Sequence, residues 1–438
     1  MKYLSLLLVL LFSIDSFSAS YYVSTSGNDN LNRGTLKQPF RTIQKGATVA
    51  IAGDSVFIRA GKYKEVITIM NSGSQDAPIV FINYKNERVL IDGAGIHMPD
   101  SLIFENHYKS AMITLKGKNY IEIHGLHINN TEEMGIFGVF CDHILIKKNK
   151  TSKTEASAIM FRYCKNIRVD GNTVKDACFS KPEECISIAY VDTFEVLNNE
   201  VFQTDTTIKT FGGEGIDIKN GSKNGSVHHN TVHNLKKLGI YIDSYRKPQI
   251  NVEVFNNVVY NCRNGIALSS ELGEEQDNIH VYNNICYLNY HSGIIITSWK
   301  GNGKRKNISI YNNTLYRNGN THSGGGITIE SIPGSNISVT NNICYNNVRW
   351  QISARDSSKY TFENNLVFPF RNYKILWEVK GSNSVEANPL FVDELSFDLH
   401  LSEDSPARDK GKNSDLQFDF DKKKRPSGKG NDIGAFEY

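Results

Sequence analysis

The fold is decided by residues 252–257 (VEVFNN), 279–284 (IHVYNN), 308–313 (ISIYNN) and 337–342 (ISVTNN). In each stretch apolar and polar residues alternate, as in a half-buried strand, and an asparagine follows. Further copies end at the asparagines Asn149, Asn172, Asn199, Asn230 and Asn365. The asparagines recur every 23–31 residues. This spacing is too short for a domain and predicts a solenoid with one coil per repeat.

A second series of strands lies between these repeats. Its members are residues 158–162 (AIMFR), 185–189 (CISIA), 215–219 (GIDIK), 239–243 (GIYID), 265–269 (GIALS), 293–297 (GIIIT) and 326–330 (GITIE). Their second and fourth residues are apolar and face inward, whereas the third and fifth face outward and form columns, with coils about 4.8 Å apart. We therefore predict an all-β parallel β-helix of about ten or more coils, with the asparagines stacked as a hydrogen-bonded ladder at one bend.

The two ends of the chain differ from the repeats. Residues 1–20 begin with Lys2, an apolar run and small residues, which predicts a secretory signal peptide. Residues 21–385 are expected to form the β-helix, starting with a capping helix over 41–52, and residues 386–438 a C-terminal cap, because a solenoid core must be covered at its ends. No later stretch is apolar enough to span a membrane, so we expect export to the periplasm or the cell exterior.

Composition narrows the function classes. The chain has 49 basic and 46 acidic residues and a net charge of +3, so a nucleic-acid partner is not expected. Its seven cysteines include no C-x-x-C pair, which predicts buried free thiols rather than a disulfide framework or a zinc site. Cys178 and Cys185 are the pair best placed for a single bridge. Nothing in the sequence indicates an oligomer, and we expect a monomer.

Charged residues gather on consecutive coils of the second series. In residues 212–219 (GGEGIDIK), Asp217 and Lys219 share the outward face of a strand, and Glu214 lies at the corner that leads into it. The register of neighbouring coils adds further residues to this patch: Arg162, Glu184, Tyr241, Asp243, Tyr245, Arg246 and Glu271. Trp299 follows a later strand and is a candidate for stacking on a sugar ring.

Several carboxylates this close together repel one another unless they are protonated or bind a cation. Glu184, Glu214 and Asp217 are therefore candidate ligands of Ca²⁺, which takes six or more oxygen ligands in a loose geometry. The competing interpretation is an ordinary ladder of surface ion pairs. The concentration of charge on three or four adjacent coils favours a site.

Residues 21–30 (YYVSTSGNDN), 39–50 (PFRTIQKGATVA) and 52–63 (AGDSVFIRAGKY) resemble the N-terminal module of secreted bacterial right-handed β-helix proteins. Many of these are polysaccharide lyases, especially the pectate lyases of polysaccharide lyase family 9. The stretch from Glu214 to Asp217 is similar to that family's Asp-Asp-Gly-x-Asp calcium motif, with Gly213 in place of the first Asp and Glu214 in place of the second. The resemblance implies Ca²⁺ and an acidic polysaccharide substrate.

The family's catalytic lysine lies in the column that here holds Tyr241. Lys219 resembles instead the catalytic lysine of the alginate lyase and chondroitinase B β-helices, which has a glutamate five residues before it, as Glu214 is here. That family also uses an arginine on the next coil, for which Arg246 is the nearest candidate.

We therefore expect a secreted, Ca²⁺-dependent lyase that cleaves a uronate-containing polysaccharide by β-elimination. The metal neutralises the uronate carboxylate, and an unprotonated Lys219 or Tyr241 removes the adjacent proton. Arg162 and Arg246 supply local positive charge. Two alternatives stay open: a glycoside hydrolase that uses Asp217 and Asp243 as its acid and base, and a non-catalytic carbohydrate-binding or surface β-helix.

Overall fold

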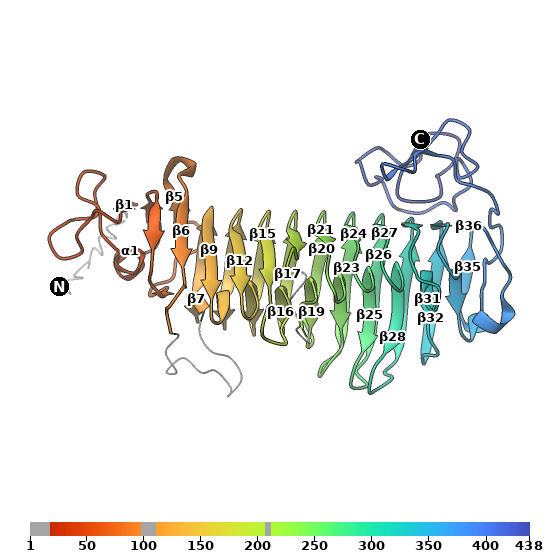
Figure 1. Cartoon of the computed structure of the whole chain (residues 1–438), viewed down its shortest axis with the longest axis horizontal. Helices are drawn as coiled ribbons and strands as arrows, with labels where there is room; N and C mark the ends of the chain where they lie inside the picture. Colours follow the sequence, from red (N-terminus) through yellow and green to blue (C-terminus); the bar gives the residue numbers. More distant parts are fainter. Residues whose placement is uncertain (1–17, 98–110, 206–211) are drawn as a thin grey trace, which may run out of the picture.

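The computed structural model describes residues 18–97, 111–205 and 212–438. Most of the predicted signal peptide, residues 1–17, lies outside the described part. The described residues wind into a long parallel β-helix whose coils follow one another along a single axis (Figure 1). Three parallel sheets run the length of this solenoid, so the predicted all-β parallel β-helix is confirmed.

Sheet 1 holds the strands of the asparagine repeats: β1 (Ser20–Val23), β2 (Ser55–Ile58), β5 (Ile79–Asn83), β8 (Asn119–His124), β11 (Asp142–Lys147), β14 (Lys165–Asp170), β17 (Asp192–Leu197), β20 (Lys223–His228), β23 (Gln249–Phe255), β26 (Gln276–Tyr282), β29 (Arg305–Tyr311), β32 (Gly334–Thr340) and β35 (Thr361–Glu363).

Sheet 2 holds the second predicted series: β4 (Ile67–Thr68), β7 (Ala111–Lys116), β10 (Met134–Val139), β13 (Ile159–Arg162), β16 (Ile186–Ala189), β19 (Ile216–Lys219), β22 (Ile240–Asp243), β25 (Ile266–Ser270), β28 (Ile294–Ser298), β31 (Gly325–Ile329) and β34 (Trp350–Ala354).

Sheet 3 was not singled out in the sequence. It consists of β3 (Gly61–Tyr63), β6 (Val89–Asp92), β9 (Leu126–Thr131), β12 (Lys150–Thr154), β15 (Thr173–Ala177), β18 (Glu200–Phe202), β21 (Thr231–His233), β24 (Val258–Tyr260), β27 (Ile285–Tyr287), β30 (Thr314–Tyr316), β33 (Ile343–Tyr345) and β36 (Leu366–Phe368). Most of these strands have three residues, too few for an alternating pattern to stand out from a loop.

The asparagine ladder forms at the bend between sheets 1 and 3. Asn257 is representative: its Nδ2 donates to Val227 O and to Asn284 Oδ1, both at 2.9 Å, and its Oδ1 accepts from Asn230 N at 3.0 Å. From Asn172 to Asn342, each coil thus ties its buried amide to the coils on either side. This satisfies the polar groups of a bend that water does not reach.

The inward columns of sheet 2 are apolar and fully buried, as at Ile216, Ile218, Ile240 and Ile242. A glycine directly precedes each of these sheet 2 strands from β19 to β31, because successive coils meet closely there. A Cβ on Gly215 would lie 2.5 Å from the carbonyl oxygen of Gly239 on the next coil. The packing of coil on coil therefore explains the repeated Gly-Ile pair of the sequence.

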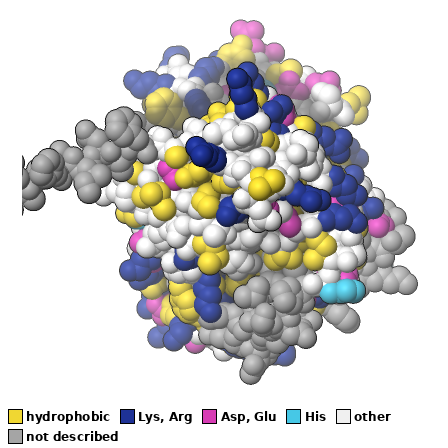
Figure 2. Space-filling model, turned by 90° about the vertical axis from the view of Figure 1, so that its left-hand side faces the viewer, with side chains coloured by type: hydrophobic (Ala, Val, Ile, Leu, Met, Phe, Trp, Pro, Cys, Tyr) yellow, Lys and Arg dark blue, Asp and Glu magenta, His cyan; other side chains and the backbone are white. Residues whose placement is uncertain are grey.

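The N-terminal end carries the short helix α1 (Ile43–Val49), which is shorter than the predicted 41–52. Thr42 caps it by accepting from Lys45 N at 3.1 Å. The helix packs against β1, β2 and β4 and buries Ile43 and Ala47 in the main core. Seen end-on, the described surface here shows basic side chains with scattered hydrophobic ones (Figure 2).

The C-terminal segment folds back along the solenoid (Figure 1). Its antiparallel strands β37 (Phe391–Asp393) and β38 (Asp398–Leu401) belong to a second apolar cluster, which includes Ile343 and Leu366 of sheet 3. This segment covers the flank of the last coils. Short 3₁₀ turns, η1 (Tyr84–Asn86), η3 (Ser357–Lys359) and η4 (Lys374–Leu376), complete the elements.

All seven cysteines are free and buried, and Cys178 and Cys185 form no bridge. Among the described residues, no helix is long and apolar enough to cross a membrane.

Candidate active site

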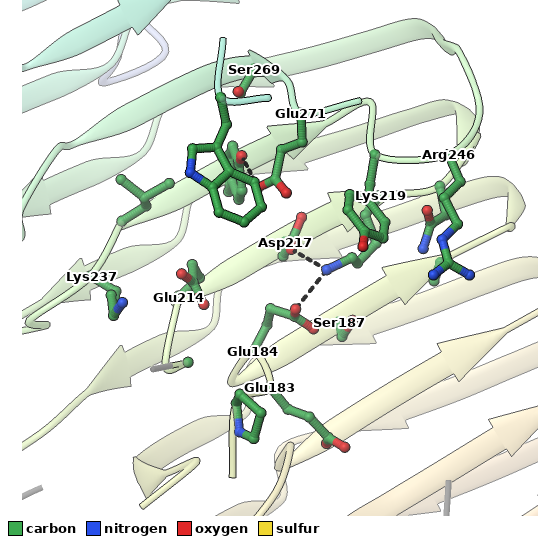
Figure 3. Close-up of a pocket in the computed structure, with 18 of the residues that line it drawn as sticks. Glu183, Glu184, Ser187, Glu214, Asp217, Lys219, Lys237, Arg246, Ser269 and Glu271 are labelled. Atoms are coloured by element: carbon green, nitrogen blue, oxygen red, sulfur yellow. Dashed lines mark hydrogen bonds and ion pairs between the residues drawn. The ribbon is translucent and has the colours of Figure 1, made fainter. Parts of the chain in front are cut away.

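A cleft of about 1020 Å³ lies on the outer face of sheet 2, over β13 to β28. Ten of the eleven residues predicted for the site line it: Arg162, Glu184, Glu214, Asp217, Lys219, Tyr241, Tyr245, Arg246, Glu271 and Trp299. The eleventh, Asp243, is 1% exposed and lies beneath this lining, within reach of Lys219. The structure thus brings the whole predicted set together (Figure 3).

The strand register explains why these residues meet. Asp217 pairs with Ser187 on one neighbouring coil and with Tyr241 on the other. Lys219 pairs in the same way with Ala189 and Asp243, and Arg162 lies one coil before Ala189. The predicted columns are confirmed because the repeat length sets which residues stand side by side.

Lys219 is the centre of the cluster. Its Nζ lies 2.6 Å from Glu184 Oε1 and 3.2 Å from Asp217 Oδ2 (Figure 3). Asp243 Oδ2 lies 3.9 Å from the same atom. Burial by itself lowers the pKa of Lys219, but the three carboxylates outweigh burial and hold it well above the ordinary value. In this arrangement Lys219 is therefore an ammonium ion at neutral pH.

Asp217 and Asp243 are buried, and their carboxylate oxygens lack most of the hydrogen-bond partners they could accept from. Asp217 is 1% exposed, and neither of its carboxylate oxygens accepts a hydrogen bond from the described residues; the same holds for Asp243 Oδ1. Burial raises the pKa of both carboxyl groups well above the usual range, although Lys219 partly opposes the shift. Binding of a cation or a proton would stabilise such buried carboxylates.

Glu214 stands at the corner before β19, as predicted, and lines the cleft. Burial, followed by repulsion from Glu184, raises its pKa to about 7. Glu184 itself contacts the ammonium of Lys219 at 2.6 Å. The site thus holds one glutamate that binds a proton near neutral pH and one that is paired with a cation.

Tyr241 takes the place that Asp217 holds on the previous coil. Its hydroxyl donates to Glu271 Oε1 at 2.6 Å. Burial, with further contributions from Asp243 and Glu271, raises the pKa of the phenol well above its ordinary value. Tyr241 is therefore a protonated phenol at rest, with a carboxylate placed to receive its proton.

Basic and aromatic side chains surround this floor. The Arg162 guanidinium lies 5.1 Å and 5.2 Å from the ring centroids of Tyr163 and Tyr190. Arg246 lies against the ring of Tyr245 at 5.1 Å. Lys181, Lys237 and Arg263 complete the basic part of the lining. An anionic ligand is thus met by cations on several sides of the cleft.

The residues can be tested against the predicted Ca²⁺. The oxygen donors of Glu184, Glu214 and Asp217 match its preference, and the buried Asp217 oxygens that accept no hydrogen bond from the described residues match its charge. As the side chains lie, no three acidic, histidine or cysteine residues of the described chain are arranged to hold a metal ion. Two of the three candidate ligands, Glu184 and Asp217, contact Lys219 Nζ instead. The donor set therefore fits Ca²⁺ in its chemistry, but two of its members now contact Lys219.

Some lining residues were missed in the sequence. Ser187 faces the cleft next to Asp217, is fully buried, and its hydroxyl has no partner among the described residues. Its position in 185–189 (CISIA) was a signal that could have identified it. Lys181, Lys237 and Arg263 come from loops between sheets 3 and 2, where no period fixes a residue's direction.

Comparisons with known proteins agree with this architecture. Residues 21–177 match a family model described as "Pel9A-like, right handed beta helix region", and residues 202–331 match one described as "Right handed beta helix region". The chain is 30% identical over 448 residues to "Uncharacterized protein YwoF" of Bacillus subtilis (strain 168), covering 88% of this chain and 92% of the relative.

Two solved structures share the fold over nearly the whole chain. "The complex structure of XylC with xylose" has a TM-score of 0.60 at 14% identity and covers 95% of this chain and 98% of its own. "Crystal structure of pectate lyase Pel9A" has a TM-score of 0.55 at 17% identity and covers 96% and 97%. At these identities the likeness shows the fold alone.

Proposed function

We propose that this chain, which belongs to the Pel9A-like family of right-handed β-helix proteins that degrade polysaccharides, cleaves a uronate-containing polysaccharide by Ca²⁺-dependent β-elimination. The observation that carries the proposal is the cluster on the cleft floor: three carboxyl groups around Lys219, with buried Asp217 oxygens that accept no hydrogen bond from the described residues. The signal-like pattern of residues 1–20 supports export of the enzyme from a bacterial cell.

The basic lining supports an acidic substrate. Arg162 and Arg246 flank the carboxyl cluster on the cleft wall, each packed on tyrosine rings. A guanidinium can bind a carboxylate through two parallel N–H···O hydrogen bonds. A uronate chain would therefore be held by its carboxylates while a glycosidic bond lies over Lys219.

In β-elimination a base takes the proton next to the uronate carboxylate, the bond to the leaving sugar oxygen breaks, and a carbon–carbon double bond forms. Glu184, Glu214 and Asp217 would hold Ca²⁺, which when bound neutralises the substrate carboxylate and so acidifies that proton. Lys219 accepts the proton only in its unprotonated form. Its three carboxylate contacts now oppose that form, so the lyase proposal requires those carboxylates to be neutralised.

Tyr241 is the alternative base. Its hydroxyl already donates to Glu271 at 2.6 Å, so a proton taken by the phenol oxygen can be offset by one passed to that carboxylate. This route leaves Lys219 protonated as an electrostatic partner of the substrate. Replacing Tyr241 by Phe distinguishes the two bases, because it removes the hydroxyl and keeps the ring.

Hydrolysis is the second candidate, and the pKa of Glu214 favours it. A glutamic acid with a pKa of about 7 beside Glu184, which contacts the Lys219 ammonium, is the pattern of a general acid next to a base or nucleophile. Asp217 and Asp243, the pair expected from the sequence, lie beneath and against Lys219. Their burial suits them to hold Lys219 rather than to meet a sugar.

Ultraviolet absorbance separates the candidates. Purified protein is mixed with pectate, alginate and glycosaminoglycans, first with Ca²⁺ and then with a chelator. We expect a rise from an unsaturated uronate product that the chelator abolishes. New reducing ends without this absorbance would move the assignment to hydrolysis. Neither signal on any glycan would leave a carbohydrate-binding β-helix.

The pH profile gives an independent distinction. Elimination needs an unprotonated base, so its rate rises with pH. Hydrolysis that uses Glu214 as the acid loses activity as pH rises through about 7, because the carboxyl group must be protonated.

A further inference from the structure

Sheet 2 continues beyond the cleft towards the C-terminal end. The column of Lys219 passes through Asp243, Ser269 and Thr297 to Glu330 and Arg355. Arg355 thus stands five coils from Lys219 in this register, or about 24 Å along the axis at about 4.8 Å per coil. A second hollow of about 450 Å³ lies here, on the same outer face.

The tryptophans of the chain gather along this path. The sequence has three, of which Trp299 lines the cleft and Trp350 and Trp377 line the second hollow. Each has a basic side chain over its ring. Lys300 Nζ lies 4.3 Å from the Trp299 centroid, and the guanidinium carbons of Arg349 and Arg355 lie 5.9 Å and 4.1 Å from those of Trp350 and Trp377.

Arg355 and Trp377 form the accessible part of the second hollow. Trp377 is 45% exposed. Arg355 is exposed as well, and no carboxylate in the described part of the chain pairs with it. Glu330 is the acidic residue of the lining, and its Oε2 already accepts a hydrogen bond from Thr297 at 2.5 Å. The hollow therefore offers an exposed guanidinium that forms no ion pair with the described residues, packed against one face of a partly exposed indole ring.

We propose that this hollow is a distal subsite, in which Trp350, Trp377 and Arg355 bind an anionic sugar unit of the polysaccharide chain that is cleaved over Lys219. A pyranose ring packs on an indole face, and a guanidinium pairs with a carboxylate through two hydrogen bonds. The floor supports this, because Thr328 and Ser353 lie in the column of Asp217 and carry short side chains. That the bound polysaccharide is a uronate polymer is taken from the proposed function, on which this subsite therefore rests.

The position of the subsite has a consequence for substrate length. A chain that follows the outward columns lies along the solenoid axis. It must then span five coils to occupy both the cleft and the distal hollow, so only an oligosaccharide of several units reaches both. Binding at the second hollow adds affinity for long chains and none for short ones.

The test measures binding, which does not require cleavage. Trp377→Ala and Arg355→Gln are compared with the wild type by electrophoresis in gels that contain polygalacturonate, alginate or a neutral xylan. Tyr438→Ala is the matched control, since Tyr438 is 42% exposed and carries Arg408 over its ring at 3.8 Å, but lies in the C-terminal segment. Competition with short and long oligouronates then measures the dependence on chain length.

We expect each subsite variant to bind the acidic polymers about fivefold to tenfold more weakly than the wild type, as for one stacking or charge-assisted contact. Affinity for short oligouronates should change less than twofold in the same variants. Equal retardation of wild type and both variants overturns the distal subsite while the proposed function stands. A wild type that acidic polymers do not retard overturns both proposals. Loss of xylan binding equal to the loss of uronate binding overturns the anionic specificity.

Discussion

Two regions of this solenoid bury polar side chains, but they differ in whether those side chains find hydrogen-bond partners. In the asparagine ladder, the Asn257 amide donates to Val227 O and Asn284 Oδ1 and accepts from Asn230. On the cleft floor, Asp217 is as deeply buried, yet neither of its oxygens accepts a hydrogen bond from the described residues. Both regions bury polar side chains on successive coils.

The difference shows how a repeat fold separates stability from function. An amide is both donor and acceptor, so a column of amides satisfies itself and stabilises the stack. A carboxylate only accepts, so a cluster of carboxylates needs a cation or protons from elsewhere. Buried carboxyl groups therefore destabilise the fold where buried amides stabilise it, and the cleft gains reactive groups at the expense of stability.

The largest expected effect comes from Lys219→Met, which removes the cation that the cleft carboxylates share. The side chain keeps most of its volume but loses three carboxylate contacts. We expect kcat/KM on the polysaccharide to fall at least about 10³-fold. Lys223→Met is the control, because Lys223 is exposed and pairs with Asp192 outside the cleft. Circular dichroism checks that both variants fold, and a loss under tenfold for Lys219→Met would remove it from the site.

Asn257→Ala tests the ladder. It leaves Asn230 N and Val227 O without partners inside the core. We expect the free energy of unfolding to fall by about 3 kcal/mol. Asn251→Ala should lower the free energy of unfolding by only about 1 kcal/mol. The Asn251 side chain donates to Asn224 in an exposed ladder, where water can replace the hydrogen bond. The remaining cost arises because the φ of 56° at this position disfavours alanine. Denaturant titration measures both, and equal losses would contradict the role of burial.

Asp217→Asn should stabilise the protein, in contrast to the two asparagine variants. It removes one of the three carboxyl groups around a single ammonium and supplies an amide donor in its place. We expect the free energy of unfolding at pH 7 to rise by about 2 kcal/mol, while catalytic activity is lost. A stability gain with retained activity would show that Asp217 is not needed for the reaction.

The last prediction is a change in the pH dependence of stability. The pKa of Glu214 is raised to about 7 in the folded state, so the folded protein holds a proton that the unfolded chain releases at lower pH. Stability is therefore lost as pH rises from about 5 to 7, at up to about 1.4 kcal/mol per pH unit.

Glu214→Gln should remove this part of the slope, because the amide does not titrate. Glu403→Gln is the control, since Glu403 is exposed on the C-terminal segment. Thermal unfolding at a series of pH values gives the slopes. If Glu214→Gln and the wild type have parallel curves, Glu214 is not the group that titrates.

Much of the fold could be predicted because the repeat length fixes the register. Aligning residues 215–219 (GIDIK) with residues 239–243 (GIYID) implied that Asp217 stands beside Tyr241, and Lys219 beside Asp243, and both pairs are present. Sheet 3 could not be recognised, since its three-residue strands carry too little pattern. The extent of α1 was overestimated, because Ala50 leaves the helix with an extended backbone.

Within the site, the sequence predicted which residues meet but not how they interact. Lys219 could reach several acidic groups, and its side chain has four rotatable bonds that strand register does not restrict. Lys181, Lys237 and Arg263 come from loops, as do Trp299 and Trp377, so their places depend on how each loop closes.

The sequence by itself determined the coil, the ladder and the columns of side chains, because each follows from a period and from alternation along a strand. Only the tertiary structure decided that Lys219 sits among its carboxylates, that Asp243 is sealed beneath them and that Arg355 extends the same column. Those outcomes depend on burial and on loops that cover the outer face of sheet 2. Burial and loop closure are set by the whole folded chain and leave no periodic trace in the sequence.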